Sequence, residues 1–204
     1  MIIQWNGHSC FTLKTAQGTV VLDPYAPGSV PGLPPLKLTA DAVLCSHGHA
    51  DHNYVQGVEL SGRPCGVQVE ALPCFHDGAR GAKRGSNLIH ILSAEGMRVA
   101  HLGDLGHDLE LEQLEKLRGA DVLMIPVGGF YTIDAEQAHQ IVEELRPRIV
   151  LPMHYRGEGF GYEVLSPVGD FLALTVGPVE RYPGSSLEVT KDTPAQTAVL
   201  TCPQ

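Results

Sequence analysis

The sequence has few basic residues, and they are scattered. It contains 14 lysines and arginines against 23 aspartates and glutamates, which gives a formal net charge of -9 at pH 7. No block of lysines or arginines is present, whereas binding to a phosphate backbone relies on clustered cations. We therefore expect no nucleic-acid partner.

Long apolar runs are also lacking. No stretch approaches the roughly 20 consecutive apolar residues of a transmembrane helix. The first ten residues, MIIQWNGHSC, lack the basic region and the long apolar segment of a secretory signal. We therefore expect neither a signal peptide nor a membrane partner.

Cysteine is present but in no paired motif. The five cysteines are an odd number and include no C-x-x-C pair, so we expect reduced, mostly buried thiols of a cytoplasmic protein. The 204 residues are 43% hydrophobic and 18% charged. This composition is typical of a globular chain with a substantial core, and it predicts one domain spanning residues 1–204.

Histidine is abundant, with ten in the chain, and three of them lie in one short segment. The sequence SHGHADHN contains His47, His49, Asp51 and His52, and it follows the apolar run at 42–45. In an extended segment, residues two apart project to the same side, so His47, His49 and Asp51 can converge on one point. His52 then lies on the other side, where a second ion can bind. Imidazole with carboxylate favours zinc, manganese or iron over calcium.

Three more polar side chains occur where predicted strands end. His76 follows the run ending at residue 75, Asp104 follows the run at 98–102, and His154 follows the run at 149–151. Loops held by a rigid scaffold often carry binding sites. A carboxylate such as Asp104 can bridge two ions. Together with the histidine segment, these residues predict a dinuclear metal site.

Strand patterns predominate in the first half of the chain and alternate with helices in the second half. The pattern predicts strands at residues 2–5, 10–14, 19–22, 42–45, 67–75, 87–93, 97–102, 121–126 and 148–151, followed near the end by one or two more. Helices are predicted at 109–117, 134–145 and 167–174. Two groups of strands with intervening helices predict an α+β fold in which two sheets pack between helical layers.

The same motifs resemble a known family. HGHADH, the histidine of FHDGARGAKRGSN, the aspartate of HLGDLGH and the histidine of LPMHY are similar to the metallo-β-lactamase fold superfamily. The match is nearest to its small stand-alone hydrolases, the branch with ascorbate-phosphate lactonase-like proteins. The resemblance implies an αββα four-layer sandwich of two mixed β-sheets flanked by helices. It implies that one metal binds His47, His49 and His76, that a second binds Asp51, His52 and His154, and that Asp104 bridges them.

The resemblance also indicates the reaction. Redox members of the superfamily typically carry a glutamate within the leading motif, where this chain has Gly48 and Ala50, so hydrolysis is favoured. No G-x-S-x-G nucleophile motif is present. We expect a hydroxide between two divalent ions to attack an ester, lactone or similar bond in a small substrate, phosphorylated or not. Asp51 and Asp104 are the expected catalytic carboxylates, and the ions are expected to be zinc, with manganese or iron as alternatives.

Two other functions remain open. One is a phosphodiesterase that acts on a small substrate. The other, less favoured, is a non-catalytic scaffold that binds metal. Turnover of phosphodiesters without ester hydrolysis would distinguish the first, and metal binding without any turnover would distinguish the second.

Further residues are expected near the metals. The resemblance suggests that His8 contacts substrate or supports a ligand, although it could also be buried against Trp5 and Phe11. Asp23 could accept a hydrogen bond from a ligand imidazole and so fix its tautomer, or it could cap the Asp-Pro turn.

The remaining candidates lie in loops. Lys83 and Arg84, flanked by glycines, are a candidate anion-binding pair, with a solvated charged loop as the alternative. His107 could donate a proton or support a ligand. Tyr155 could line the pocket or only pack. Asp77, Tyr131 and the segment 157–161 are weaker candidates, and the histidines at 90, 101 and 139 are interpreted as structural.

Overall fold

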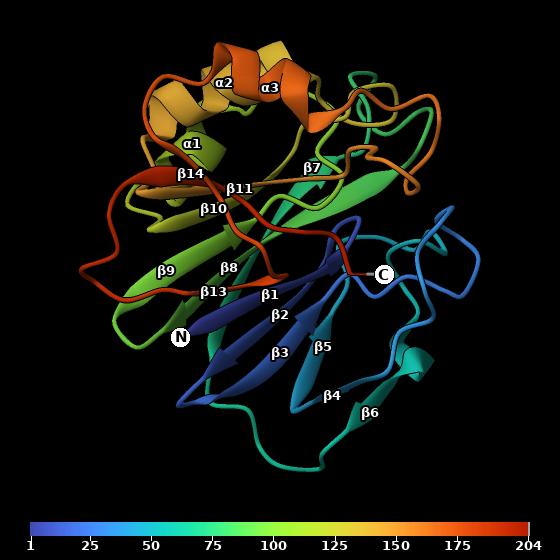
Figure 1. Ribbon diagram of the computed structural model, residues 1–204, viewed down its shortest axis with the longest axis vertical. Coiled ribbons are helices and arrows are strands. Elements are labelled where there is room, and N and C mark those ends of the chain that lie inside the picture. Colours follow the sequence, from blue (N-terminus) through green and yellow to red (C-terminus); the bar gives the residue numbers. More distant parts are fainter. Residues whose placement is uncertain (204) are drawn as a thin grey trace.

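The computed structural model describes residues 1–203, and two large sheets packed face to face form its centre (Figure 1). One sheet has five strands in the order β13-β1-β2-β3-β5, and the other has seven in the order β12-β14-β11-β10-β9-β8-β7. Both sheets combine parallel and antiparallel pairs. The predicted sandwich of two mixed sheets is therefore confirmed.

The five-stranded sheet is built mainly from the beginning of the chain. Its strands are β1 (Ile2–Gly7), β2 (Cys10–Thr15), β3 (Gly18–Leu22), β5 (Ala42–Leu44) and β13 (Ser186–Glu188). Successive side chains of a strand point to opposite faces. Phe11 and Leu13 accordingly enter the main core between the sheets, whereas Cys10 and Val21 enter a smaller core on the outer face. Apolar residues on both faces indicate a sheet that is covered on both sides.

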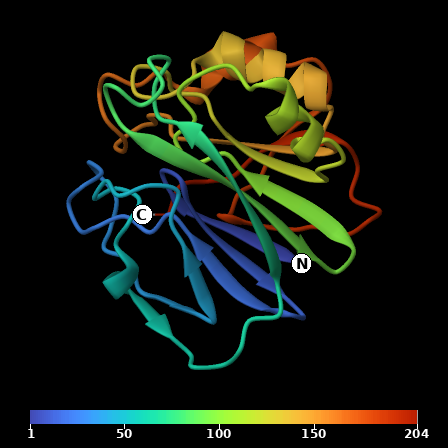
Figure 2. The ribbon, with the colours of Figure 1, turned by 180° about the vertical axis from the view of Figure 1, so that it is seen from behind.

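The seven-stranded sheet carries the helices. Its strands are β7 (Gln68–Phe75), β8 (Ser86–Ala94), β9 (Met97–His101), β10 (Val122–Pro126), β11 (Ile149–Met153), β12 (Val179–Arg181) and β14 (Gln196–Val199). Every residue of β10 and β11 is buried, as expected for parallel strands covered on both faces. The helices α1 (Leu111–Leu117), α2 (Ala135–Leu145) and α3 (Val168–Leu174) all lie over this sheet (Figures 1 and 2). Asp134 and Gln137 form the predicted capping box of α2.

The outer face of the five-stranded sheet is covered by a different kind of layer. A loop, the 3-10 turn η1 (Val55–Gly57) and the ribbon of β4 (Leu38–Ala40) with β6 (Val58–Leu60) lie there. Tyr25, Val30 and Leu33 of the loop pack into the smaller core. Prolines at 24, 27, 31, 34 and 35 disfavour a helix in this segment. Within residues 1–203, this layer therefore consists of a loop, η1 and a ribbon, where the predicted four-layer sandwich has helices.

Three details differ from the predicted strands. The ribbon of β4 and β6 was not predicted. The apolar run at 42–45 forms β5, which is a half-buried edge strand that pairs with β3 rather than a fully buried strand. The end of the chain supplies three short strands rather than one or two, and β13 returns to the first sheet to pair with β1. None of the helices among residues 1–203 has the length and apolar character needed to cross a bilayer.

Candidate metal centre

The loops that follow β1, β3, β5, β7, β9 and β11 meet at one edge of the sandwich. In Figure 1 this edge is on the right, where loops from both halves gather. The six loops begin at the carboxyl ends of their strands and contribute His8, Asp23, the segment from His47 to His52, His76, Asp104 and His154. Side chains separated by up to 146 positions in the chain, such as those of His8 and His154, therefore lie together, with ring centroids 4.1 Å apart.

Asp104 lies at the centre of this cluster. Its Oδ2 is 3.2 Å from Nε2 of His52, of His76 and of His154, and 3.9 Å from Nε2 of His47. Its backbone N–H donates to Oδ1 of Asn87 at 3.0 Å, which anchors the loop after β9. One carboxylate oxygen thus approaches four imidazoles, as a ligand shared between two ions would.

Two groups of possible metal ligands surround Asp104. The first contains His47, His49 and His76, with one ring nitrogen from each within 4.8 Å of the others. The second contains Asp51, His52, His154 and also His8, within the same spread. The structure therefore brings all seven predicted ligands together, with His8 as an addition. His47 and His52 also form a third group with Asp104, so the two sets adjoin each other.

Several buried polar atoms in the cluster have no hydrogen-bond partner. They include Nε2 of His47 and of His52, Nδ1 of His76 and of His154, and Oδ1 of Asp104. A buried polar atom without a partner is destabilising. Of these atoms, Nε2 of His47 and of His52 face Oδ2 of Asp104, where a bound cation would give them a partner.

The protonation states of His47 and Asp104 suit a metal, whereas His52 would release a proton on binding one: burial alone would lower its pKa, but Asp104 and Asp23 hold it well above the usual range. Burial and the neighbouring His52 lower the pKa of His47 to about 3, so its imidazole is neutral. Burial alone would raise the pKa of Asp104, but His154 and His52 hold it well below its usual range. Neutral imidazoles and ionised carboxylates are the forms that bind metal. The nitrogen and oxygen donors therefore fit a divalent transition-metal ion such as zinc.

Asp23 and Ser46 hold two of these imidazoles in place. Oδ2 of Asp23 is 2.8 Å from Nδ1 of His52 and accepts a hydrogen bond from the Ser46 hydroxyl at 2.6 Å. Oγ of Ser46 in turn lies 2.9 Å from Nδ1 of His47. Because that hydroxyl donates to Asp23, it accepts from His47, which leaves Nε2 of His47 unprotonated and free to bind metal. The hydrogen bond predicted for Asp23 is present, whereas Ser46 was not predicted.

Three residues of the site have left-handed backbone conformations. The φ angles of His8, Asp23 and His154 are 52°, 46° and 54°. Such conformations are unfavourable for residues other than glycine and persist where the surrounding structure enforces them. Three of the seven non-glycine residues with positive φ among residues 1–203 therefore lie in the loops that carry the cluster.

A cavity of ≈ 270 Å³ opens beside the cluster. Its lining residues are His49, Asp51, His76, Arg84, Asp104, Tyr131, His154 and Tyr162. The guanidinium of Arg84 lies 5.5 Å from the centre of the Tyr131 ring and donates to the Phe130 carbonyl at 3.1 Å. The hydroxyl of Tyr162, which was not predicted, lies 3.2 Å from Oδ2 of Asp51. The cavity has room for a small molecule next to the proposed metal ligands.

Three of the residues expected near substrate lie elsewhere. Lys83 is exposed and does not line the cavity. Tyr155 is buried in the core, with its ring centroid 5.4 Å from that of Trp5. Nε2 of His107 accepts from the Phe75 backbone N–H at 3.1 Å, so this ring joins the loop after β9 to the end of β7. Arg84 and Tyr131 are thus the loop candidates that reach the cavity.

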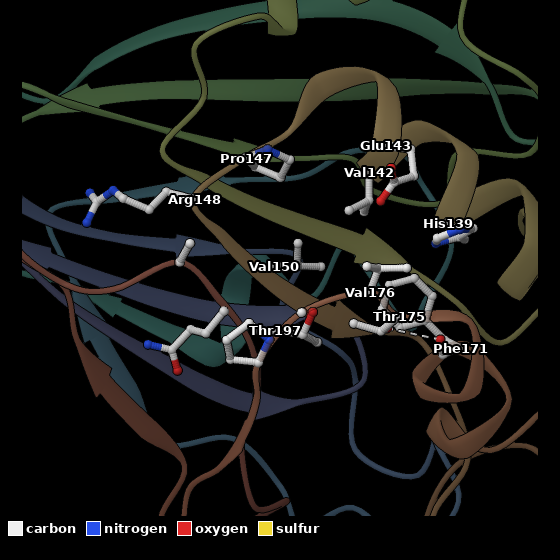
Figure 3. A pocket seen from close by; sticks show the side chains of 14 residues that line it. His139, Val142, Glu143, Pro147, Arg148, Val150, Phe171, Thr175, Val176 and Thr197 are labelled. Carbon is white, nitrogen blue, oxygen red and sulfur yellow. Dashed lines mark hydrogen bonds between the residues drawn. The ribbon is translucent and has the colours of Figure 1, made fainter.

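A second cavity, of ≈ 110 Å³, lies at the opposite end of the seven-stranded sheet. Figure 3 shows His139 and Glu143 of α2 on one side of it, with Phe171 and Thr175 on another. Arg148, which precedes β11, also borders it, whereas His154 follows the other end of that strand. None of the metal-binding groups found among residues 1–203 includes a residue of this cavity. His139 therefore lies far from the ligands, as its structural interpretation requires.

The sandwich and the histidine-aspartate cluster at its edge define a protein of the metallo-β-lactamase fold. The family model described as "Beta-lactamase superfamily domain" matches residues 2–154, and the chain belongs to this family.

Relatives agree with this assignment. A UPF0173 metal-dependent hydrolase of Thermoplasma acidophilum is 28% identical over 185 residues, which cover 75% of this chain and 82% of the relative. A crystal structure from Thermotoga maritima, named for a Zn-dependent hydrolase of the metallo-β-lactamase superfamily, is 35% identical with a TM-score of 0.77 and covers 98% of this chain and 97% of that one. Igni18 from Ignicoccus hospitalis, described as a novel metallo hydrolase, shares the fold at 21% identity, a TM-score of 0.63 and coverage of 93% and 99%.

Proposed function

We propose that this protein is a metal-dependent hydrolase that binds two divalent ions and cleaves an ester or lactone bond in a small, negatively charged substrate. The observation that carries the proposal is the position of Asp104 between two groups of metal-binding side chains, beside a cavity. The relatives named as metal-dependent hydrolases support the reaction class, and the name of the Thermotoga maritima structure favours zinc.

Each of the two proposed ions would be bound by its own set of side chains from the cluster. His47, His49 and His76 would hold one, Asp51, His52 and His154 would hold the other, and Asp104 would contact both. Bound divalent ions polarise a scissile bond and lower the pKa of water, so that hydrolysis proceeds at neutral pH. Asp23 and Ser46 keep the rings of His52 and His47 in the orientation and tautomer that this requires.

Tyr162 is in a position to hold a proton at the edge of the cavity. Burial, together with the neighbouring carboxylate of Asp51, raises the pKa of its phenol well above the usual value. The phenol is therefore neutral at physiological pH and can donate a hydrogen bond. Its hydroxyl donates to the Ser29 carbonyl at 2.6 Å, and Oδ2 of Asp51 lies 3.2 Å from the same oxygen, so the phenol ties the Ser29 loop to the cavity edge beside Asp51.

The charge of the substrate follows from Arg84. Among the residues that line the cavity it is the one permanent cation, and no carboxylate of residues 1–203 forms an ion pair with it. A guanidinium binds carboxylate or phosphate oxygens through paired hydrogen bonds. We therefore assign Arg84 to an anionic substituent of the substrate, remote from the bond that is cleaved.

The loop that carries Arg84 is fixed by one carboxylate. Oδ1 of Asp77 accepts from the backbone N–H groups of Ala79 and Gly81, and Oδ2 accepts from those of Lys83 and Arg84, at 2.7 to 3.0 Å. Fixed backbone geometry limits the directions that the Arg84 side chain can take. The position of the guanidinium over the Tyr131 ring and the hydrogen bond to the Phe130 carbonyl limit them further.

The test combines elemental analysis with a substrate panel. Protein purified without added metal is analysed for zinc, manganese and iron, and then assayed on esters and lactones with and without a carboxylate or phosphate group, and on phosphodiesters. The proposal expects two ions per chain and faster turnover of the anionic esters or lactones. Turnover of phosphodiesters alone would favour a phosphodiesterase, and full metal occupancy without any turnover would favour a non-catalytic scaffold.

A further inference from the structure

His8 lies inside the cluster, but it belongs neither to the seven proposed metal ligands nor to the residues proposed to contact substrate. The side chain is 1% exposed, and neither of its ring nitrogens has a hydrogen-bond partner. Its ring centroid is 4.1 Å from that of His154 and 5.2 Å from that of His52. A buried imidazole without partners, facing two proposed metal ligands, requires an explanation because desolvation of its nitrogens is costly.

The backbone holds this ring in one place. His8 occupies the turn between β1 and β2 with a φ of 52°, after Gly7 with a φ of 104°. The carbonyl of His8 accepts a hydrogen bond from the Trp5 indole at 2.8 Å and one from the backbone N–H of His154 at 3.3 Å. The second bond ties the His8 turn directly to the loop of a proposed ligand. The strained conformation therefore directs the imidazole at the second ligand group.

The distances are those expected between ligands of one ion. Two donors at about 2.1 Å from a five-coordinate zinc ion lie roughly 3.0 to 3.6 Å apart. Nε2 of His8 is 3.4 Å from Oδ2 of Asp51, and Nε2 of His52 is 3.7 Å from the same oxygen. His8, Asp51, His52 and His154 each place a donor atom within 4.8 Å of the others.

We propose that His8 is an additional protein ligand of the second ion, together with Asp51, His52 and His154. This inference rests on the proposed metal site and adds a ligand that the HGHADH motif does not include. The two metal positions then differ in their number of protein ligands. Besides Asp104, the second position has four and the first has three. We expect the second position to bind metal more tightly and to fill first.

The competing role is a hydrogen bond from His8 to Asp51 with no contact to the ion. The two roles require different chemical groups in the side chain at position 8. A positioning role needs only an N–H group directed at Asp51, which glutamine can supply. A ligand role needs an unprotonated imidazole nitrogen, which glutamine lacks.

The first experiment uses the unmodified chain loaded with ¹¹³Cd²⁺ as a zinc substitute. Proton–cadmium correlation spectra identify histidine rings bound to the ion, and the His8→Gln spectrum assigns the His8 signals. We expect the His8 ring protons to couple to the same cadmium resonance as those of His52 and His154. Coupling of His52 and His154 without His8 would overturn the inference and leave the metal site intact. A spectrum in which no histidine couples would overturn the proposed metal site as well.

The second experiment measures affinity by calorimetric titration of metal-free protein with Zn²⁺. For His8→Gln we expect the dissociation constant of the tighter ion to rise by about 10–100-fold or more, since even loss of a ligand's hydrogen-bond partner has an effect of this size. The matched control is His90→Gln, because His90 is also buried with an unpartnered Nδ1 but belongs to no metal-binding group. The control should bind both ions as the wild type does. Wild-type affinity of His8→Gln would show that an N–H donor is sufficient and would overturn the inference.

Discussion

Oδ2 of Asp23 lies 2.8 Å from Nδ1 of His52, and neither side chain is exposed to solvent. The same oxygen accepts from Ser46, whose hydroxyl contacts His47. One carboxylate therefore controls ligands in both metal-binding groups, although Asp23 is a member of neither. This relationship makes the tautomers of the ligands sensitive to a single substitution.

Asp23→Asn should weaken metal binding while retaining similar volume. If the amide group of asparagine faces His52, it donates to Nδ1 and forces the proton to Nε2, the atom that faces Asp104. We expect affinity for at least one ion to fall about 10–100-fold, the usual effect of losing such a partner. Titration with Zn²⁺ measures this. Asp41→Asn is the control, because Asp41 also accepts backbone and side-chain hydrogen bonds but lies outside the metal-binding groups. Unchanged affinity in Asp23→Asn would contradict the assigned tautomer.

Asp104→Ala should remove the shared ligand. The imidazoles of His52, His76 and His154 would lose the carboxylate that lies 3.2 Å from each of them. We expect activity to be abolished and about one ion per chain to be lost, since a bridging ligand supports both positions. His139→Ala, in α2 beside the other cavity, should change neither quantity. Elemental analysis and turnover of the two variants are compared, and equal effects would refute the assignment of Asp104.

Arg84→Ala should affect anionic substrates selectively. Hydrogen bonds to charged groups contribute about 1.5–3 kcal/mol, which corresponds to roughly a 10–150-fold loss of kcat/KM. The loss should be confined to substrates with a carboxylate or phosphate group, and neutral esters should react at the wild-type rate. Lys83→Ala is the matched control, because the neighbouring lysine is exposed and outside the cavity. Equal losses on neutral and anionic substrates would argue against an anion-binding role.

The seven residues that form the cluster could be predicted from the sequence because their pattern is local. The order of residues in HGHADH and the position of His76, Asp104 and His154 after apolar runs could be read without knowing which strands pair. The main strands and helices were likewise predicted from their periodicity. By contrast, the pairing of β13 with β1 joins residues that are more than 180 positions apart, and no local pattern indicates it.

The surroundings of the metal centre could not be predicted as well. Tyr155 was expected near substrate because it follows His154, yet it packs on Trp5, whereas Tyr162 reaches Asp51 from seven positions further along the chain. Adjacency to a ligand does not determine which way a side chain points in a loop. Ser46 was missed for a related reason: its role depends on Asp23, which is 23 positions away.

His90 should make stability depend on pH. Burial, followed by the charge of His101, lowers the pKa of His90 to about 4, from 6.5. The unfolded chain therefore takes up a proton at this residue below about pH 6.5, while the folded chain does not until about pH 4, so the free energy of unfolding falls as the pH decreases through this window. The contribution is on the order of 3 kcal/mol.

Substitution of His90 by leucine tests this dependence. Metal-free protein is unfolded with urea at pH 7 and at pH 4.5, because metal binding has a pH dependence of its own. We expect the decrease in unfolding free energy between the two values to be smaller in His90→Leu than in the wild type. Between pH 7 and pH 8 the unfolding free energy of the two proteins should change with pH to the same extent. An equal decrease in both proteins at acidic pH would show that His90 is protonated in the folded state.

Asp77 should affect substrate binding only by ordering the loop that carries Arg84. Its carboxylate accepts four backbone N–H groups between residues 79 and 84, and Asp77→Ala leaves all four without this acceptor. The loop should then become mobile, and we expect KM for anionic substrates to rise, by less than in Arg84→Ala, while metal content stays at the wild-type value. Because both substitutions remove the same ordered guanidinium, the double variant should be no worse than Arg84→Ala alone. Additive losses would mean that Asp77 supports the neighbouring His76 instead, and metal titration of Asp77→Ala would then show weaker binding of the first ion.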